Sequence, residues 1–171
     1  MPSRALPFAV ITAALTAIAV TALPWFNLRK LGMDASWNGL GMGTVSRQDL
    51  GLAPNARGWL IVAAAVFAVL AGLVALMPSA TARPLGRIMA AVAAVGATAA
   101  AFVPIAIWIR PSWYFGDFLS GLGFYADAEV DISVSKVILT ALIVILLLLA
   151  GLCAALFVER SQTAPVGDRH S

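Results

Sequence analysis

The sequence predicts an all-α integral membrane protein: a four-helix transmembrane bundle with two extracytoplasmic loops, which could form a small β-cap. Two observations predict this fold class. Of the 171 residues, 61% are hydrophobic and only 11% are charged, whereas about a quarter of the residues in a soluble domain are charged. The hydrophobic residues also form four long blocks, and the charges fall almost entirely between these blocks. A lipid bilayer is the solvent that this pattern indicates.

The four hydrophobic blocks cover about residues 7–26, 59–77, 88–109 and 137–158. Each has the roughly 17–25 residues that a helix needs to cross a bilayer, and none contains a charged residue or a histidine. We therefore expect one four-span membrane domain over residues 1–160 and a flexible cytoplasmic tail over residues 161–171. The first block could instead be a signal peptide cleaved near Val20 and Ala22, but the hydrophobic run continues to Phe26 and favours an uncleaved helix.

The basic residues predict the orientation in the membrane. The short connection after the second block carries Arg83 and Arg87 and no acidic residue, and short basic connections tend to stay in the cytoplasm. The two sides have similar numbers of basic residues overall, so the density of these residues close to the helix ends decides the prediction. The sequence therefore predicts a multi-pass plasma-membrane protein with both termini in the cytoplasm.

Small residues predict where the helices touch, because helices in lipid associate by close packing. The third block has the clearest ridge of small residues, and we expect it to be central in the bundle. The polar groups within the blocks are mainly threonines, whose hydroxyls can bond to their own helix. Proton-coupled transport and intramembrane proteolysis need ionisable or metal-binding groups at depth, so this composition argues against both. The predicted helix-packing residues are Ala93, Gly96, Ala97 and Ala100 in the third block and Gly151 in the fourth.

The first loop, over residues 27–58, contains Asn38-Gly39, the dipeptide best suited to a type I′ hairpin turn. Phe26, Leu28 and Val45 could line strands around this turn. An irregular glycine-rich loop fits the same sequence equally well, since the alternation of hydrophobic and polar residues is poor.

The second loop combines a dense aromatic segment with a strand pattern. Val130, Ile132 and Val134 alternate with polar residues, which predicts a strand that could pair with the first loop. The aromatic residues exceed what a simple connection needs, so we expect this segment to lie along the membrane surface and bind a partner or a lipid. The alternative is that the rings seal the bundle or form an interfacial belt. The predicted binding residues are Trp113, Tyr114, Phe115, Phe118, Phe124 and Tyr125.

Asp127, Glu129 and Asp131 place three carboxylates on one face of an extended segment, and calcium favours such oxygen ligands. The segment lacks the glycine turn and the full ligand set of a calcium loop, so a solvated acidic face is the preferred interpretation. We predict no metal and no cofactor. The Lys and Arg residues form no stripe or cluster, which argues against nucleic-acid binding.

Two short motifs carry a resemblance to a known family. Leu23-Pro24-Trp25 closes the first block, Gly58-Trp59 opens the second, and an outer loop of similar length lies between them. In these features the chain resembles small actinobacterial membrane proteins of the tryptophan-operon-associated four-span family. That family implies four spans and no established catalytic site, so no residue role is carried over. Claudin-like proteins share the layout, but Trp37-Asn38-Gly39-Leu40-Gly41 lacks the second tryptophan and the paired cysteines of their signature.

The leading functional hypothesis is a non-enzymatic membrane accessory or scaffold protein. It would bind another membrane protein or a lipid-like ligand through its extracytoplasmic aromatic loops, and its partners would be the lipid bilayer together with that protein or further copies of the chain. One alternative is a small oligomeric transporter or channel for an apolar or neutral solute. Another is an enzyme that uses acidic loop residues for acid–base chemistry, namely Asp117, Asp127, Glu129 or Asp131.

Overall fold

The computed structural model describes residues 4–27, 29, 34–44, 56–77, 82–110, 114 and 133–162. Its elements are α1 (Ala5–Thr21), β1 (Pro24–Asn27), β2 (Ser36–Asn38), α3 (Trp59–Leu76), α4 (Ala82–Ile109), β3 (Ser133–Val134) and α7 (Lys136–Gln162). By length and composition, α3, α4 and α7 could each cross a membrane, and α1 is a shorter apolar helix. The predicted architecture of long apolar helices with a small sheet is therefore confirmed.

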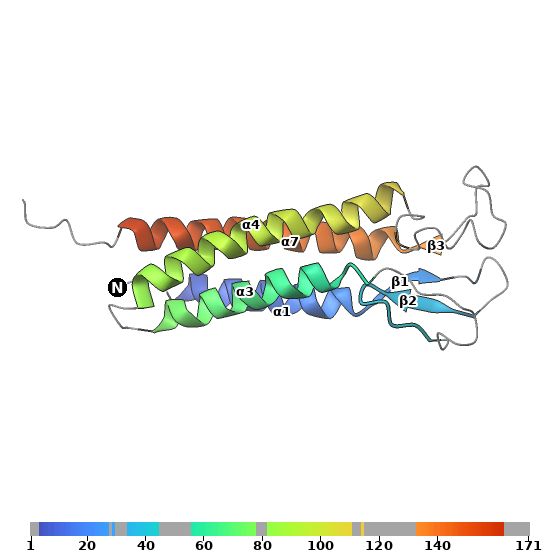
Figure 1. Ribbon diagram of the computed structural model, residues 1–171, viewed down its shortest axis with the longest axis horizontal. Coiled ribbons are helices and arrows are strands. Elements are labelled where there is room, and N and C mark those ends of the chain that lie inside the picture. The colour runs from blue at the N-terminus through green and yellow to red at the C-terminus, as the bar shows by residue number, and fades with distance from the viewer. Residues whose placement is uncertain are drawn as a thin grey trace, which may run out of the picture.

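The four helices run antiparallel to their neighbours along one long axis (Figure 1). The strands lie at one end, called here the strand end, and the first and last described helices begin and end at the other, called here the terminal end. Both α1 and α4 pack along α3 and α7, so α3 and α7 lie diagonally across the bundle. The third predicted span, α4, is therefore one of four corners and not central as expected.

The buried positions of the helices alternate in steps of three and four residues. In α1 these positions are Pro7, Val10, Ala14, Ala17 and Thr21. In α7 they are Leu139, Leu142, Leu146, Leu149, Cys153 and Leu156. This spacing is typical of helices that pack almost parallel with their side chains interlocked. Alanines dominate the buried faces of α3 and α4. Their small side chains leave space in the interior of the bundle, and the larger leucines of α7 fill it.

The helix ends differ from the predicted ones. The helix α1 has 17 residues, or about 25 Å, and ends at Thr21 instead of Phe26. Pro24 explains this early end, because proline disfavours a helical conformation in the residue before it, and the chain enters β1 at this point. In contrast, α4 begins at Ala82 instead of 88 and continues through Pro104. The last helix extends to Gln162 and so includes two residues predicted for the tail.

The strands form a three-stranded antiparallel sheet in the order β2-β1-β3. Phe26 in the central strand is opposite Trp37 on one side and Val134 on the other. The sheet thus joins the first and second loops as the predicted cap does. The other residues of the predicted second-loop strand, Val130 and Ile132, lie outside the described residues.

A hairpin turn does form at Asn38, but it is not of type I′. The N–H of Gly41 donates to the Asn38 carbonyl oxygen (3.1 Å), and the N–H of Asn38 donates to that of Met42 (2.9 Å). The positive φ of 78° falls on Gly41, while Asn38 and Gly39 keep negative φ. This geometry is that of a three-residue hairpin loop, in which glycine takes the left-handed position after a type I turn. Leu28 and Val45, predicted to flank the turn, lie outside the described residues.

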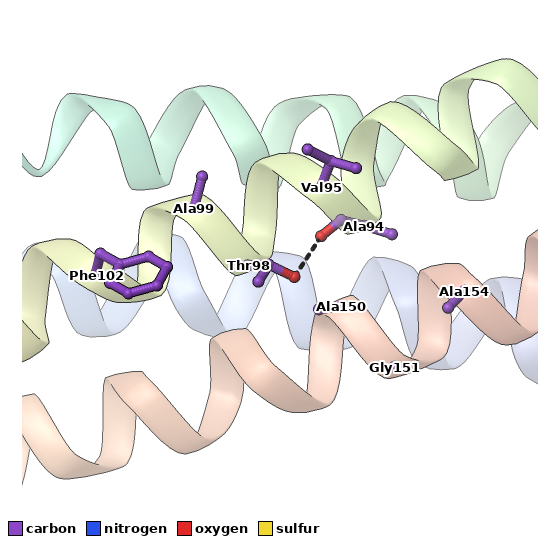
Figure 2. A pocket seen from close by; sticks show the side chains of 8 residues that line it. All are labelled: Ala94, Val95, Thr98, Ala99, Phe102, Ala150, Gly151 and Ala154. Carbon is purple, nitrogen blue, oxygen red and sulfur yellow. Dashed lines mark hydrogen bonds between the residues drawn. The ribbon is translucent and has the colours of Figure 1, made fainter.

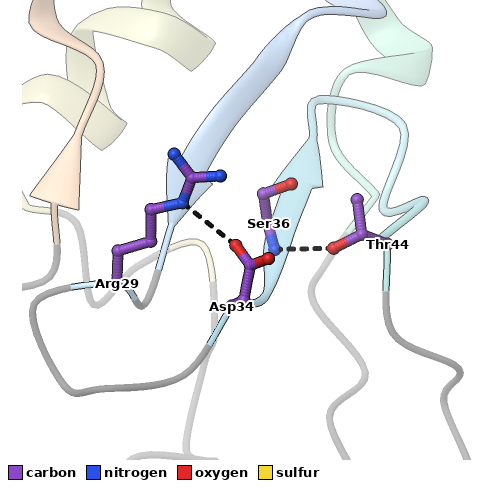
Figure 3. Close-up of polar contacts among 4 residues, drawn as sticks. All are labelled: Arg29, Asp34, Ser36 and Thr44. Carbon is purple, nitrogen blue, oxygen red and sulfur yellow. Dashed lines mark hydrogen bonds and ion pairs between the residues drawn. The ribbon is translucent and has the colours of Figure 1, made fainter.

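Polar contacts fix the base of this hairpin, as Figure 3 shows. The N–H of Ser36 donates to the Thr44 hydroxyl (3.1 Å), and the N–H of Thr44 donates back to the Ser36 carbonyl oxygen (3.0 Å). Arg29 and Asp34 form an ion pair of 3.0 Å, but their side chains are 76% and 86% exposed. Water screens an exposed pair of this kind, so it adds about 1 kcal/mol or less to stability.

Candidate functional site

Aromatic side chains form the core of the strand end. Trp25, Phe26, Trp37 and Tyr114 come from three separate segments of the chain, and all are buried. The Tyr114 ring stacks on Phe26 with centroids 4.3 Å apart and an interplanar angle of 26°, and its centroid lies 6.4 Å from that of Trp25. The indole N–H of Trp25 donates to the Val20 carbonyl oxygen (3.5 Å) near the end of α1. This aromatic core holds the cap to the bundle.

Asn38 and Gly39 connect the cap to the helix ends. The N–H of Gly39 donates to the Thr21 carbonyl oxygen at the end of α1 (3.1 Å), and the N–H of Gly58 before α3 donates to the Gly39 carbonyl oxygen (2.9 Å). The Tyr114 hydroxyl donates to the Asn38 carbonyl oxygen. These bonds satisfy backbone groups that helix ends leave without intrahelical partners.

The N–H of Ser135, just before α7, donates to the Trp25 carbonyl oxygen (2.9 Å). Together with the bonds of Asn38 and Gly39, this contact ties α1, α3, α7 and the segment after α4 to a single cap.

Two glycines make this close approach possible. A Cβ at Gly39 would lie 2.3 Å from the Trp25 indole, and a Cβ at Gly58 would lie 2.3 Å from the Gly39 carbonyl oxygen. Real side chains do not tolerate such distances, so any other residue at either position must displace the cap. The sequence already marks Gly39 through the Asn38-Gly39 dipeptide, but the role of Gly58 depends on a contact far along the chain.

The predicted aromatic binding segment is described only at Tyr114. This residue is fully buried, so it belongs to the interior of the cap and not to an exposed binding surface as expected. Burial also raises the pKa of its phenol well above the usual range, because the phenolate loses its hydration. The remaining predicted binding residues lie outside the described residues: Trp113, Phe115, Phe118, Phe124 and Tyr125.

Two other tryptophans at the strand end point outward. Trp59 begins α3 and is 57% exposed, and Trp108 lies near the end of α4 and is 47% exposed. The Lys136 ammonium at the start of α7 lies 5.9 Å from the centroid of the Trp108 ring, a cation–π contact. Exposed tryptophans at one level of a helical bundle are typical of the headgroup region of a membrane.

A groove of about 550 Å³ lies between α4 and α7 on the outside of the bundle (Figure 2). The side chains of Thr98 and Phe102 approach it from α4, and Gly151 lies on its α7 side. The Thr98 hydroxyl donates to the Ala94 carbonyl oxygen (2.9 Å), so the one hydroxyl in the lining is already satisfied. The groove is lined by Ala94, Val95, Thr98, Ala99, Phe102, Ala150, Gly151 and Ala154.

The predicted helix-packing residues divide between the interior and this groove. Ala93, Ala97 and Ala100 are buried in the bundle, and a Cβ at Gly96 would lie 3.6 Å from the Ala64 Cβ in α3. Gly151 is different, since a Cβ there would meet nothing within 4 Å. We expected Gly151 to pack against another helix of the chain, but it faces outward, because the buried face of α7 follows the leucine positions instead.

At the terminal end, Arg160 of α7 crosses the bundle to the diagonal helix. Its guanidinium donates to the Ala75 carbonyl oxygen near the end of α3, and Gly86 of α4 leaves room for it, since a Cβ there would lie 3.4 Å from Arg160 Nη1. A basic group at a helix C-terminus is favourable because unpaired carbonyl groups gather there. The sequence alone does not predict this structural role of Arg160.

Acidic and metal-binding chemistry is not assembled in the described part of the chain. No group of three or more His, Cys, Asp or Glu side chains among the described residues could hold a metal ion. The acidic residues Asp117, Asp127, Glu129 and Asp131 lie outside the described residues. Cys153 is a buried free thiol within α7.

Comparison with known proteins leaves the family open. No family model, curated protein or solved structure matches the chain. The cap, the groove and the charges at the two ends of the bundle are the features that bear on the function.

Proposed function

We propose that the chain is a four-span accessory or scaffold protein of the plasma membrane, which binds another membrane protein and carries out no catalysis. The observation that carries this proposal is the groove between α4 and α7. The small side chains of Ala94 and Ala154, and the absence of one at Gly151, leave the backbones of two membrane-length helices accessible at this groove. Helices in lipid associate where small residues let their backbones approach closely, so a transmembrane helix of a partner can pack here.

The interior of the bundle supports the same proposal. Two clusters of buried apolar residues fill it from the strand end to the terminal end. Thr21 is the buried polar residue among the described positions, and its hydroxyl donates to the Ala17 carbonyl oxygen (2.8 Å) of its own helix. Such an interior suits a packing scaffold, whereas a transporter built from this chain would need a pore between several copies.

The two ends of the bundle support the proposed membrane position. The exposed rings of Trp59 and Trp108 suit the outer headgroup region. Arg4, Arg87 and Arg160 are at the terminal end, and the positive-inside tendency assigns this end to the cytoplasm. With α1 only about 25 Å long, a roughly 30 Å hydrocarbon layer would have to thin slightly around this corner, or the neighbouring helices would shield it.

Capture of partners from membranes solubilised in mild detergent tests the proposal. We expect one membrane protein to co-purify in fixed stoichiometry with the wild-type chain and to be lost with Gly151→Leu, which fills the groove. Val144→Leu is the matched control, because Val144 is 59% exposed on α7 but does not line the groove. If no partner is captured and the purified chain forms oligomers that pass a neutral solute in liposomes, the transporter alternative replaces this proposal.

A further inference from the structure

Arg87 is an unusual residue for the position that it occupies. It lies in the second turn of α4, it is half-buried, and its guanidinium carbon is 5.5 Å from the centroid of the Phe157 ring on α7. Its Nε is buried and has no hydrogen-bond partner among the described residues. A buried donor left without an acceptor is unfavourable, and native structures usually supply one.

Two further charged residues, Glu159 and Arg160, lie on α7 near the level of Arg87. Arg160 lies three residues after Phe157 on α7, and its guanidinium passes beside Gly86, the neighbour of Arg87 in sequence. Arg160 already bonds to the Ala75 carbonyl oxygen. The ion pair between Arg29 and Asp34 lies at the strand end, so it does not neutralise Arg87. Arg87, Glu159 and Arg160 together carry a net charge of +1, because one acid accompanies two bases, and this excess favours an anion nearby.

The level of this seam indicates where such an anion would come from. Ala75, which Arg160 reaches, is one residue from the end of α3 at Leu76. The two guanidinium groups therefore lie where a membrane-length helix ends, and this is the depth of the phosphate groups of a bilayer. Phe157 provides an apolar surface under Arg87, and partial exclusion of water strengthens a charge-assisted hydrogen bond there.

We propose that Arg87, on the α4–α7 seam, binds the phosphodiester of an anionic phospholipid at the terminal end of the bundle, where Arg160 adds a second positive charge. Guanidinium groups match phosphate oxygens with two parallel hydrogen bonds, and Nε takes part in such a fork. Basic pockets between transmembrane helices are a known setting for anionic headgroups. This inference depends on the membrane placement in the proposed function, but not on the partner protein or the groove.

The test measures the thermal midpoint of the full chain in nonionic detergent while phosphatidylglycerol or phosphatidylcholine with the same acyl chains is added. We expect phosphatidylglycerol to stabilise the wild type more strongly, and Arg87→Gln to weaken its apparent affinity about fivefold, the effect of one basic residue near a charged headgroup. Arg110→Gln is the matched control, because Arg110 is an exposed arginine at the opposite end of α4. It should keep the preference for phosphatidylglycerol.

Arg87→Lys covers the case in which Arg87→Gln does not fold. It keeps the charge and loses the planar fork, so we expect an affinity between those of the wild type and Arg87→Gln, with the preference for phosphatidylglycerol retained. Equal stabilisation of the wild type by the two lipids would overturn the inference, as would equal losses in Arg87→Gln and Arg110→Gln. A chain that does not enter membranes at all would overturn the proposed function as well, whereas a chain that enters without discriminating between lipids overturns this inference alone.

Discussion

Tyr114 shows how one residue can join several parts of the chain. Its ring stacks on Phe26 in β1, and its hydroxyl donates to the Asn38 carbonyl oxygen in the hairpin turn. Neither contact is local in sequence, so Tyr114 connects a position just after α4 to β1 and the hairpin turn after α1. The ring provides the stacking contact and the hydroxyl provides the hydrogen bond, and substitutions can remove these two contacts separately.

Tyr114→Phe should destabilise the protein by about 1 kcal/mol, and somewhat more if the Asn38 carbonyl oxygen stays dry. The substitution removes the hydroxyl and keeps the ring stack on Phe26. The measurement is thermal unfolding in detergent, with Tyr114→Leu as the comparison that removes both contacts. If Tyr114→Phe were as stable as the wild type, the hydrogen bond would contribute nothing to the cap.

Alkaline pH should also destabilise the cap through Tyr114. A tyrosine in the unfolded chain ionises near pH 10, and burial raises the pKa of Tyr114 in the folded chain above that value. The contribution is complete below about pH 10 and is lost as the pH rises from there towards the folded pKa. Thermal midpoints between about pH 8 and about pH 11 should therefore fall less steeply for Tyr114→Phe than for the wild type. Parallel curves for the two proteins would exclude this assignment.

Gly39→Ala should disturb the cap by forcing the Trp25 indole to move. The new Cβ would overlap the Trp25 indole at 2.3 Å, and overpacking of this kind typically costs about 1–3 kcal/mol. Gly151→Ala is the matched control, because open space surrounds Gly151. Thermal unfolding separates the two variants, and equal midpoints would mean that the cap adapts to the larger residue.

At the scale of the elements, the helices differ in the size of the side chains that they pack in the interior. Alanines on α3 and α4 let these two backbones lie close together, and leucines on one face of α7 fill the space that remains. The opposite face of α7 has the same hydrophobic composition but is exposed, with Leu147 and Leu148 more than half accessible. Lipid and protein interior are equally apolar, so residue type alone does not separate these two faces.

Gly96→Leu and Gly151→Leu make the same chemical change on two neighbouring helices and should have different effects. The leucine at position 96 would press against Ala64, whose Cβ lies 3.6 Å from the position of a new Cβ, and should force α3 and α4 apart. The leucine at position 151 meets no neighbour within the chain and should leave folding intact. Thermal unfolding in detergent measures this difference, and similar losses for both would contradict the arrangement of the α4 and α7 faces.

For the molecule as a whole, the proposed orientation, with the terminal end in the cytoplasm, can be tested with cysteines introduced into a Cys153→Ser background. Met42→Cys places a thiol at the strand end, where the native side chain is 58% exposed, and Gln162→Cys places one at the exposed end of α7. An impermeant maleimide should label position 42 in intact cells and position 162 only after lysis. The reverse pattern would show inverted insertion, and labelling of both positions in intact cells would contradict an even number of spans.

The sequence predicts the helices well because a long hydrophobic block without charges has few stable structures other than a helix. It predicts the helix ends less well. The helix α1 ends at Thr21, shortly before Pro24 begins a strand, and α4 begins at Ala82, before the predicted hydrophobic block. A hydrophobic block marks where lipid can be, but backbone hydrogen bonds decide where a helix stops. The strand pattern of the second loop predicted β3, but its partner β1 lies mostly in the block predicted as the first helix. The turn type was not predictable either, because it depends on the φ of Gly41.

The candidate sites were predicted only in part for a related reason. Small residues such as Gly96 and Gly151 look alike in sequence, and only the direction of the buried leucine face shows which of them the chain covers. Aromatic density similarly pointed to Tyr114, but its burial depends on Phe26 in β1 and Asn38 in the hairpin turn. Pairwise contacts between distant segments are the information that a single sequence does not contain.

The position of β1 between β2 and β3 has a consequence for the order of synthesis. The strand β1 leaves the ribosome directly after the first helix, but its partner β3 comes just before the last one. During translation, one edge of β1 therefore has no backbone partner until β3, at residues 133–134 of the 171-residue chain, has been made. The finished sheet thus requires that α1, α3 and α4 have already been made, and a nascent chain stalled before β3 would present an open strand edge to chaperones and proteases.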